Sequence, residues 1–185
     1  MALNPGDFSL DLAITNLNET FGSLQKLVIV LSYIIGIALI ARGIMMYKVF
    51  ATQTMSSAQK GEFAGPLVHI IVGAFLIYFP STFKTSMMTM FGKEEANVAQ
   101  NLIGYTRISS TEKWKQISEL LVKYFKLIGL IAFLRGWIML SKMGHQGAQP
   151  GQIAKGITHI IGGILLVNIV DTINMLMELF GYKAN

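Results

Sequence analysis

Two stretches of the chain share one pattern, Ile35-Gly-Ile-Ala-Leu-Ile-Ala-Arg-Gly43 and Ile128-Gly-Leu-Ile-Ala-Phe-Leu-Arg-Gly136. Each is an apolar run that ends in an arginine followed by a glycine. Such runs are typical of transmembrane helices, in which an arginine is costly unless it lies near the membrane surface or meets a partner. The pattern therefore predicts two related membrane helices, each with a cation at a defined depth.

The composition also indicates a membrane protein. Of 185 residues, 52% are hydrophobic and only 14% are charged, and the mean hydropathy is +0.53, whereas soluble domains carry about 25% charged residues. The net charge is +5, but the basic residues are scattered between apolar segments, which favours anionic lipid over nucleic acid as their partner. The absence of cysteine excludes disulfides, thiol catalysis and cysteine-ligated metals.

Four apolar segments are long enough for the ~20 residues that cross a membrane as a helix. The third is the least apolar, because its charge-free centre extends only from Leu127 to Leu134. We therefore predict an all-α membrane protein with four transmembrane helices. The predicted spans are Leu24 to Tyr47, Ala64 to Phe91, Ile117 to Leu140 and Gly156 to Phe180.

The two halves of the chain match each other. At an offset of 93 residues, Glu19, Leu27, Ile35, Gly36, Arg42, Gly43 and Met46 correspond to Glu112, Leu120, Ile128, Gly129, Arg135, Gly136 and Met139. At an offset of 90, Ala64, His69, Ile70, Ile71, Gly73 and Leu76 correspond to Ala154, His159, Ile160, Ile161, Gly163 and Leu166. Charged residues, histidines and glycines that recur in order predict a tandem duplication of a helical hairpin. The second hairpin then has the same orientation as the first.

The predicted domains follow from this repeat. They are an N-terminal polar or amphipathic tail (1–23), a first helical hairpin (24–92), an interfacial linker (93–116) and a second hairpin (117–185). Capping-box patterns at Asn16 and Ser109 predict matching helix starts. A cleaved signal peptide is not expected, because the first 25 residues contain no Lys or Arg.

Arginine and histidine recur at the loop-side ends of the hairpins. Arg42 and Arg135 lie about six residues inside the first helix of each hairpin, and His69 and His159 about four residues inside the second, so that each pair shares a depth of ~6 to 9 Å. Such a pair can bind a lipid phosphate or an acidic residue of a partner protein. The alternative is that the arginines extend to the membrane surface and the histidines bond to loop backbone.

A second candidate pair consists of Lys126 and Asp171. Counted along straight helices from the loop, their depths agree within ~2 Å, and the matching residues of the first half, Tyr33 and Ser81, are both neutral. This pattern predicts an intramembrane ion pair. A proton or ion pathway is the alternative.

Glycines at a spacing of seven place small residues along one face of a helix, where neighbouring backbones can approach closely. Such pairs occur at Gly36 and Gly43, at Gly129 and Gly136, and at Gly156 and Gly163. The residues predicted to pack helices are Gly36, Gly43, Gly73, Gly129, Gly136 and Gly163. The sequence contains no phosphate-binding loop, no GxSxG, no HExxH and no carboxylate at metal-ligand spacing from a histidine. An enzyme is therefore not expected, nor is a metal or an organic cofactor, apart from bound anionic phospholipid.

Two segments carry a family resemblance, GPLVHIIVGAFLIYF (65–79) and KGITHIIGGILLVNIVDTINML (155–176). With the two hairpins and the overall length, they make the chain resemble the small polytopic inner-membrane proteins of type IVB secretion systems, in particular the IcmC/DotE and TraQ group of the Dot/Icm and IncI conjugation machines. Each half is also similar to the pilin subunits of type IV secretion systems. Unlike a typical pilin, the chain is predicted to be duplicated and to carry no cleavable leader.

The resemblance implies a non-enzymatic structural component of a secretion or conjugation apparatus in the bacterial inner membrane. The implied partners are membrane lipids and other secretion-system membrane subunits, in a homo- or hetero-oligomer. One alternative is a pilin-like protomer of a helical or ring assembly with bound lipid, and another is a small ion or proton channel or transporter. We expect the hairpin loops on the cytoplasmic side, because they are basic and the first 25 residues lack positive charge.

Overall fold

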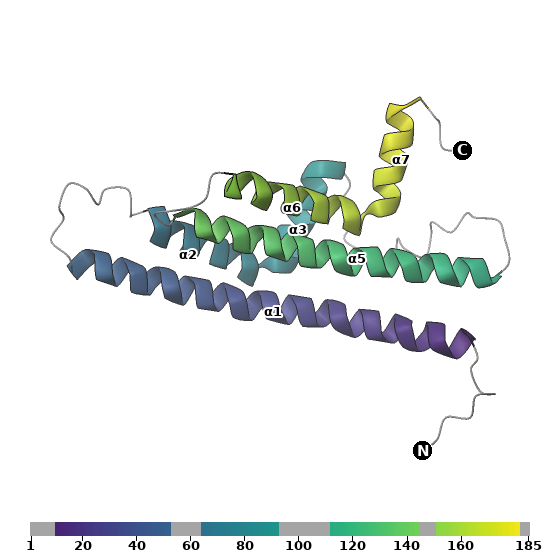
Figure 1. Ribbon diagram of the computed structural model, residues 1–185, viewed down its shortest axis with the longest axis horizontal. Coiled ribbons are helices and arrows are strands. Elements are labelled where there is room, and N and C mark those ends of the chain that lie inside the picture. Colours follow the sequence, from purple (N-terminus) through teal and green to yellow (C-terminus); the bar gives the residue numbers. More distant parts are fainter. Residues whose placement is uncertain (1–9, 53–63, 93–111, 145–150, 182–185) are drawn as a thin grey trace, which may run out of the picture.

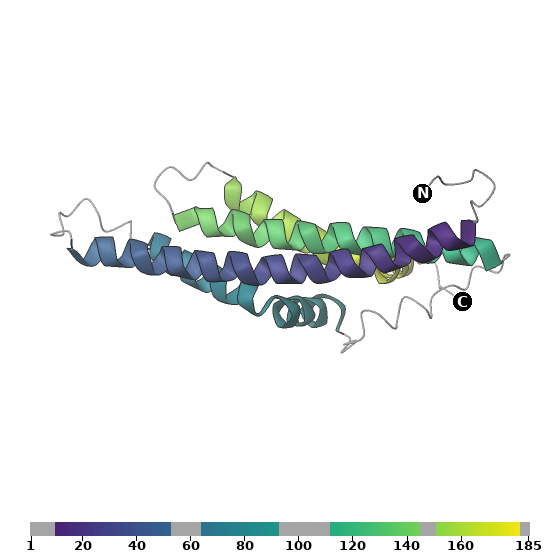
Figure 2. The ribbon, with the colours of Figure 1, turned by 90° about the horizontal axis from the view of Figure 1, so that it is seen from below.

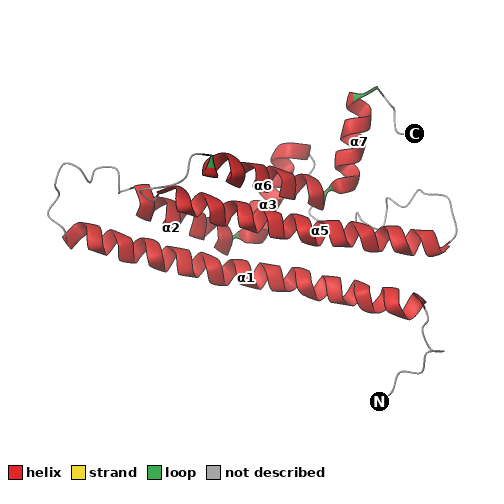
Figure 3. Cartoon of the chain, viewed as in Figure 1, coloured by secondary structure: helices red, strands yellow, loops and turns green. Residues whose placement is uncertain are grey.

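The computed structural model describes residues 10–52, 64–92, 112–144 and 151–181. Within these ranges the chain forms helices joined by short turns, and it contains no strand (Figure 3). The elements are α1 (Leu10–Thr52), α2 (Ala64–Ile77), α3 (Phe79–Phe91), α5 (Glu112–Ser141), a short 3-10 turn η2 (Lys142–Gly144), α6 (Gln152–Val167) and α7 (Ile169–Leu179). The all-α prediction is therefore confirmed for the described residues. The linker predicted at 93–116 lies mostly outside them.

Two helix pairs form the body of the molecule. α1 packs against α2, and α5 packs against α6. α5 also contacts α1 and α2, so that it runs between α1 and α6 in Figure 1. The largest fully buried apolar side chains, Phe79, Phe133 and Leu76, lie where α2 and α3 meet α5. The core therefore joins the two pairs.

The first helix is longer than the sequence predicts. α1 contains 43 residues, or about 65 Å at 1.5 Å per residue, and it passes Asn16 without interruption. The Asn16 carbonyl accepts a hydrogen bond from the Thr20 hydroxyl at 2.8 Å. The helix start predicted at Asn16 is therefore wrong, and the expected tail is helical from Leu10 onward. α5 begins at Glu112, close to the start predicted at Ser109.

The second helix of each pair ends in a sharp bend. α2 and α3 meet at 89°, and α6 and α7 meet at 95°. The short α3 and α7 consequently project from the bundle, α7 upward in Figure 1 and α3 below the long helices in Figure 2. The spans predicted over 64–91 and 156–180 are therefore not straight helices.

The bends occur at matching positions and share one hydrogen bond. The breaks fall at Tyr78 and Asn168, which are 90 residues apart. A break leaves backbone carbonyls of the preceding turn without their helical donors. In the first bend the Thr82 hydroxyl donates to the Phe75 carbonyl at 3.0 Å, and in the second the Thr172 hydroxyl donates to the Leu165 carbonyl at 2.8 Å. The same local solution thus recurs at an offset of 90.

Fewer of the described helices qualify as membrane spans than the four that the sequence predicts. Among the described residues, one helix is long and apolar enough to cross a membrane, over Ile14–Lys48, and the number rises to three if each bent pair forms one span. α5 does not pass this test. The structure is therefore consistent with a membrane protein, but it does not confirm four spans.

Candidate functional site

The predicted packing glycines lie at the contacts between helices. All six are buried. A Cβ atom added at Gly36 would lie 2.8 Å from the Gly73 carbonyl oxygen and 2.9 Å from the Ile77 nitrogen. A Cβ atom added at Gly43 would lie 2.9 Å from the Pro66 carbonyl oxygen. Because contacts below 3.0 Å with backbone leave no room for a methyl group, these glycines allow α1 and α2 to approach closely.

The second helix pair repeats these contacts. A Cβ atom added at Gly129 would lie 2.7 Å from the Gly163 carbonyl oxygen and 2.8 Å from the Val167 nitrogen, and one at Gly136 would lie 2.8 Å from the Gly156 carbonyl oxygen. Each contact partner corresponds to its counterpart in the first pair at the offset found in the sequence. Six predicted packing residues therefore occupy equivalent positions in two structurally similar interfaces.

The arginine and histidine of a hairpin lie at a similar depth, as the sequence predicts, but their side chains differ in exposure. A Cβ atom added at Gly43 would lie 3.2 Å from the His69 Cβ atom, so the neighbouring Arg42 and His69 are at a similar depth. Arg42 and Arg135 are nevertheless exposed, whereas His69 is buried and His159 is half-buried.

The histidines bond to their own helices. His69 Nδ1 donates to the Gly65 carbonyl at 2.9 Å, and His159 Nδ1 donates to the Lys155 carbonyl at 2.8 Å. This geometry favours the alternative in which the histidine is tied to backbone, although to carbonyls of the helix and not of the loop. Joint binding of lipid phosphate by arginine and histidine stays a prediction.

The ion pair expected between Lys126 and Asp171 stays a prediction, but the depth match on which it was based does not hold. Asp171 lies in the first turn of α7, beyond the 95° bend, so a depth counted along a straight helix does not apply to it. Lys126 is buried on α5. The bend therefore changes the position of Asp171 relative to the straight helix that the depth count assumed.

Lys123, on the same helix as Lys126, joins α5 to α1. Its ammonium group donates to the Asn18 side-chain oxygen at 2.9 Å. Near it, the rings of Phe21 and Tyr124 meet edge to face with centroids 6.0 Å apart. Sequence reasoning missed this link, because neither Lys123 nor Asn18 has a distinctive counterpart in the other half.

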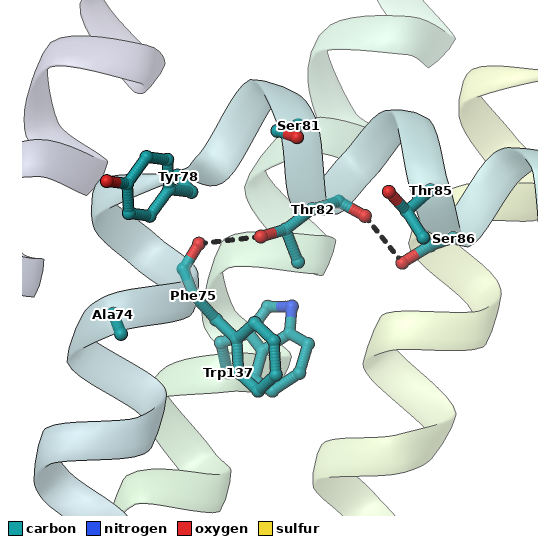
Figure 4. A pocket seen from close by; sticks show the side chains of 8 residues that line it. All are labelled: Ala74, Phe75, Tyr78, Ser81, Thr82, Thr85, Ser86 and Trp137. Atoms are coloured by element: carbon teal, nitrogen blue, oxygen red, sulfur yellow. Dashed lines mark hydrogen bonds between the residues drawn. The ribbon is translucent and has the colours of Figure 1, made fainter.

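A cleft of about 460 Å³ opens at the first bend, between α2, α3 and α5 (Figure 4). Phe75 and Trp137 form one wall, with ring centroids 4.6 Å apart. Hydroxyl groups line the other side, from Tyr78, Ser81, Thr82, Thr85 and Ser86. The lining carries no charged side chain, and among the described residues no group of three His, Asp or Glu is placed to hold a metal. The cleft therefore offers hydrogen bonds but no recognisable catalytic group.

One polar atom at this cleft lacks a partner. Among the described residues, the buried Nε1 of Trp137 has no hydrogen-bond acceptor. A buried donor without an acceptor costs about 1–3 kcal/mol.

We therefore expect Trp137→Phe to leave thermal stability unchanged or raised, because phenylalanine keeps the ring against Phe75 and removes the N–H group. Thermal unfolding in detergent, followed by circular dichroism, measures the effect. Trp137→Ala provides the control, since it also removes the ring and is expected to destabilise the protein. A loss of stability in Trp137→Phe as large as in Trp137→Ala would show that the N–H group has an acceptor.

The bends are the feature of this region that sequence reasoning did not find. Pro80 is the available signal in the first half, because proline lacks an N–H group and disrupts the preceding helical turn. The second half has no proline at the matching position. The threonines at 82 and 172 recur at the repeat offset and were the stronger signal.

Comparison of the chain with protein-family models, with curated proteins and with solved structures finds no match.

Proposed function

We propose that the protein is a non-enzymatic structural subunit of the bacterial inner membrane in which each hairpin crosses the bilayer twice. The first support is the uncovered surface of α1. Only 22% of its most apolar window is buried, and Ile34, Ile37 and Ile44 expose more than half of their surface. In water such a surface is unfavourable, whereas in a bilayer it contacts lipid or another helix.

The observation that carries the proposal is the recurrence of the same interhelical contacts in both halves. The Gly36–Gly73 and Gly129–Gly163 contacts match at the repeat offsets, as do the threonine hydrogen bonds at the two bends. Close glycine contacts are typical of membrane helices, whose association depends on packing and not on the hydrophobic effect. These matches support a tandem duplication with two hairpins of the same orientation.

In this arrangement α2 and α6 are roughly perpendicular to the membrane, and the bends turn α3 and α7 toward the membrane plane. α2 alone has 14 residues, or about 21 Å, which is less than the ~30 Å of hydrocarbon, so the bilayer has to thin around this crossing. α3 has a polar composition, FPSTFKTSMMTMF, and buries Phe79, Phe83 and Met87. Such a helix suits the boundary between hydrocarbon and headgroups, where one of its faces is wet.

The resemblance to the IcmC/DotE and TraQ group supplies the biological setting of the proposal, a type IVB secretion or conjugative transfer apparatus. An uncharged cleft and packing surfaces fit a structural component better than a catalyst. The channel alternative relied on a depth match between Lys126 and Asp171 that was counted along straight helices, and Asp171 lies beyond the bend between α6 and α7.

The proposal is tested by deletion and purification in the native host. We expect deletion to abolish conjugative transfer or effector export, and gentle detergent extraction to recover the protein with other membrane subunits of the apparatus. Phe133→Ala, which weakens the core between the hairpins, should reduce this recovery, and Phe125→Ala serves as the matched surface control. Normal transfer in the deletion strain would refute the role in secretion.

A further inference from the structure

Apart from the contact of α1 with α5, which joins equivalent helices, the contact between the two hairpins is asymmetric. α2 of the first hairpin packs against α5 of the second, and Phe79 and Phe83 of the adjoining α3 are both in ring contact with Phe133 of α5. A two-fold arrangement would require the reverse contact, of α1 with α6. No comparable contact joins α1 to α6 among the described residues.

An asymmetric, or heterologous, contact between repeated units uses two different faces. A chain of two units forms one such contact, which covers one face of the first unit and a different face of the second unit. The equivalent of each covered face is left uncovered on the other unit. The unused faces can be located by the repeat offsets. They are the α6–α7 side of the second hairpin and one side of α1.

The α1 face is uncovered at positions where α5 is buried. Ile34 is 58% exposed and its counterpart Leu127 is 8% exposed, while Ile37 is 61% exposed and its counterpart Leu130 is 7% exposed. At the buried Lys126 the first half has Tyr33, so this face of α1 carries no charge to desolvate. This face of α1 is therefore as apolar as the matching face of α5, but it lacks the lysine whose burial is unfavourable.

The α6–α7 side shows the same difference. Ile173 is 47% exposed and its counterpart Phe83 is 5% exposed, while Met177 is 38% exposed and its counterpart Met87 is 8% exposed. Gly162 is exposed, and a Cβ atom added there would meet no atom within 4 Å. The side of this hairpin that matches the buried side of α2 and α3 is therefore open.

We propose that copies of this protein assemble head to tail, with the α6–α7 side of one copy packed against α1 of the next as α2 and α3 pack against α5 within the chain. This inference rests on the proposed membrane role and adds the partner, which is a second copy of the chain. Because the contact is heterologous, repeated addition produces a ring if the rotation closes and a filament if it does not.

The internal contact gives the pair of residues that a test requires. Phe75 and Trp137 lie with ring centroids 4.6 Å apart across the hairpin boundary. Their counterparts are Leu165, at an offset of 90, and Ile44, at an offset of 93. In the assembly, Leu165 of one copy lies next to Ile44 of the following copy.

Cysteine cross-linking in native membranes tests the assembly, since the chain has no cysteine of its own. The double variant Ile44→Cys/Leu165→Cys, treated with a short bifunctional thiol reagent, should give a ladder of dimers, trimers and larger species. The two single variants should give dimers only when they are expressed together. Phe75→Cys/Trp137→Cys should cross-link within one chain, which confirms that the hairpin contact and the reagent length are correct.

A matched control uses a position that is exposed in both halves. Ile157 is 46% exposed and its counterpart Leu67 is 48% exposed, so Ile44→Cys/Ile157→Cys should give no ladder. Self-cross-linking of the Ile44→Cys single variant to the same extent as the double variant would indicate a two-fold dimer and overturn the proposal. Intramolecular cross-linking of the internal pair without any ladder from the double variant would also overturn it, while leaving the role in secretion to the deletion experiment.

Discussion

Gly129→Ala is expected to destabilise the protein by about 1–3 kcal/mol, the usual cost of adding volume to a packed interior. The added methyl group would lie 2.7 Å from the Gly163 carbonyl oxygen and 2.8 Å from the Val167 nitrogen. Both are backbone atoms of α6, so the clash can be relieved only by moving one helix away from the other. Thermal unfolding in detergent, followed by circular dichroism, measures the loss.

Gly162→Ala is the matched control, because it makes the same change on α6 where no atom lies within 4 Å of the new Cβ. Alanine is a better helix former than glycine by about 1 kcal/mol, so this variant should be as stable as the natural protein or more stable. Gly36→Ala should behave like Gly129→Ala, since it meets the Gly73 carbonyl oxygen at 2.8 Å. Equal stability of Gly129→Ala and Gly162→Ala would show that α5 and α6 are not in close contact.

Phe133→Ala is expected to cost about 3 kcal/mol, near the lower end for a buried phenylalanine because lipid can replace part of the lost contact. Phe133 is fully buried. Its ring lies 5.5 Å from that of Phe79, 5.1 Å from that of Phe83 and 6.2 Å from that of Trp137, measured between centroids. Its removal therefore leaves a cavity between the hairpins.

The control for this prediction is Phe125→Ala, on the same helix, where 37% of the side chain is exposed. It should change the unfolding temperature much less than Phe133→Ala does. If the two variants unfold at the same temperature, Phe133 does not join the hairpins. In that case the internal contact would also be unsuitable as a template for assembly between copies.

The glycine contacts were predictable from the sequence because a small residue in a membrane helix has a specific physical use. Glycines that recur at a spacing of seven lie on one face, and the histidine and arginine positions then fix which helices form a pair. Gly36 lies opposite Gly73, and Gly129 lies opposite Gly163. The sequence predicted that these glycines pack helices, but the pairing of Gly36 with Gly73 and of Gly129 with Gly163 comes from the structure.

The bends were missed because each apolar segment was interpreted as one straight span. Polar residues follow each break, Ser81 and Thr82 in the first half and Asp171 and Thr172 in the second, but polar residues also occur inside membrane helices and do not by themselves predict a bend. The depth match between Lys126 and Asp171 was likewise counted along a straight helix, and it does not allow for the bend before Asp171. A single threonine in an apolar segment does not predict that its hydroxyl replaces a lost backbone donor. The only signal in the sequence is that threonine recurs at the matching positions 82 and 172.

The structure also changes the interpretation of Arg42 and Arg135. The sequence places each arginine in an apolar helix and suggests that a histidine lies beside it. In the structure both arginines are exposed, while the histidine nitrogens bond to backbone carbonyls of their own helices. The feature that the two hairpins share most closely at this depth is the glycine after each arginine, Gly43 or Gly136, which packs against the second helix of its pair.

The central claim is that each hairpin crosses the membrane twice in the same orientation, and thiol accessibility at three sites tests it most directly. Single variants Ser57→Cys and Gln146→Cys report the two hairpin loops, and Glu95→Cys reports the segment between the hairpins. With an impermeant thiol reagent, intact cells should leave both loop variants unlabelled and label Glu95→Cys, and all three should react after lysis. Labelling of only one loop would contradict the parallel repeat, and identical behaviour of all three sites in intact cells would show that the bent pairs do not cross the membrane.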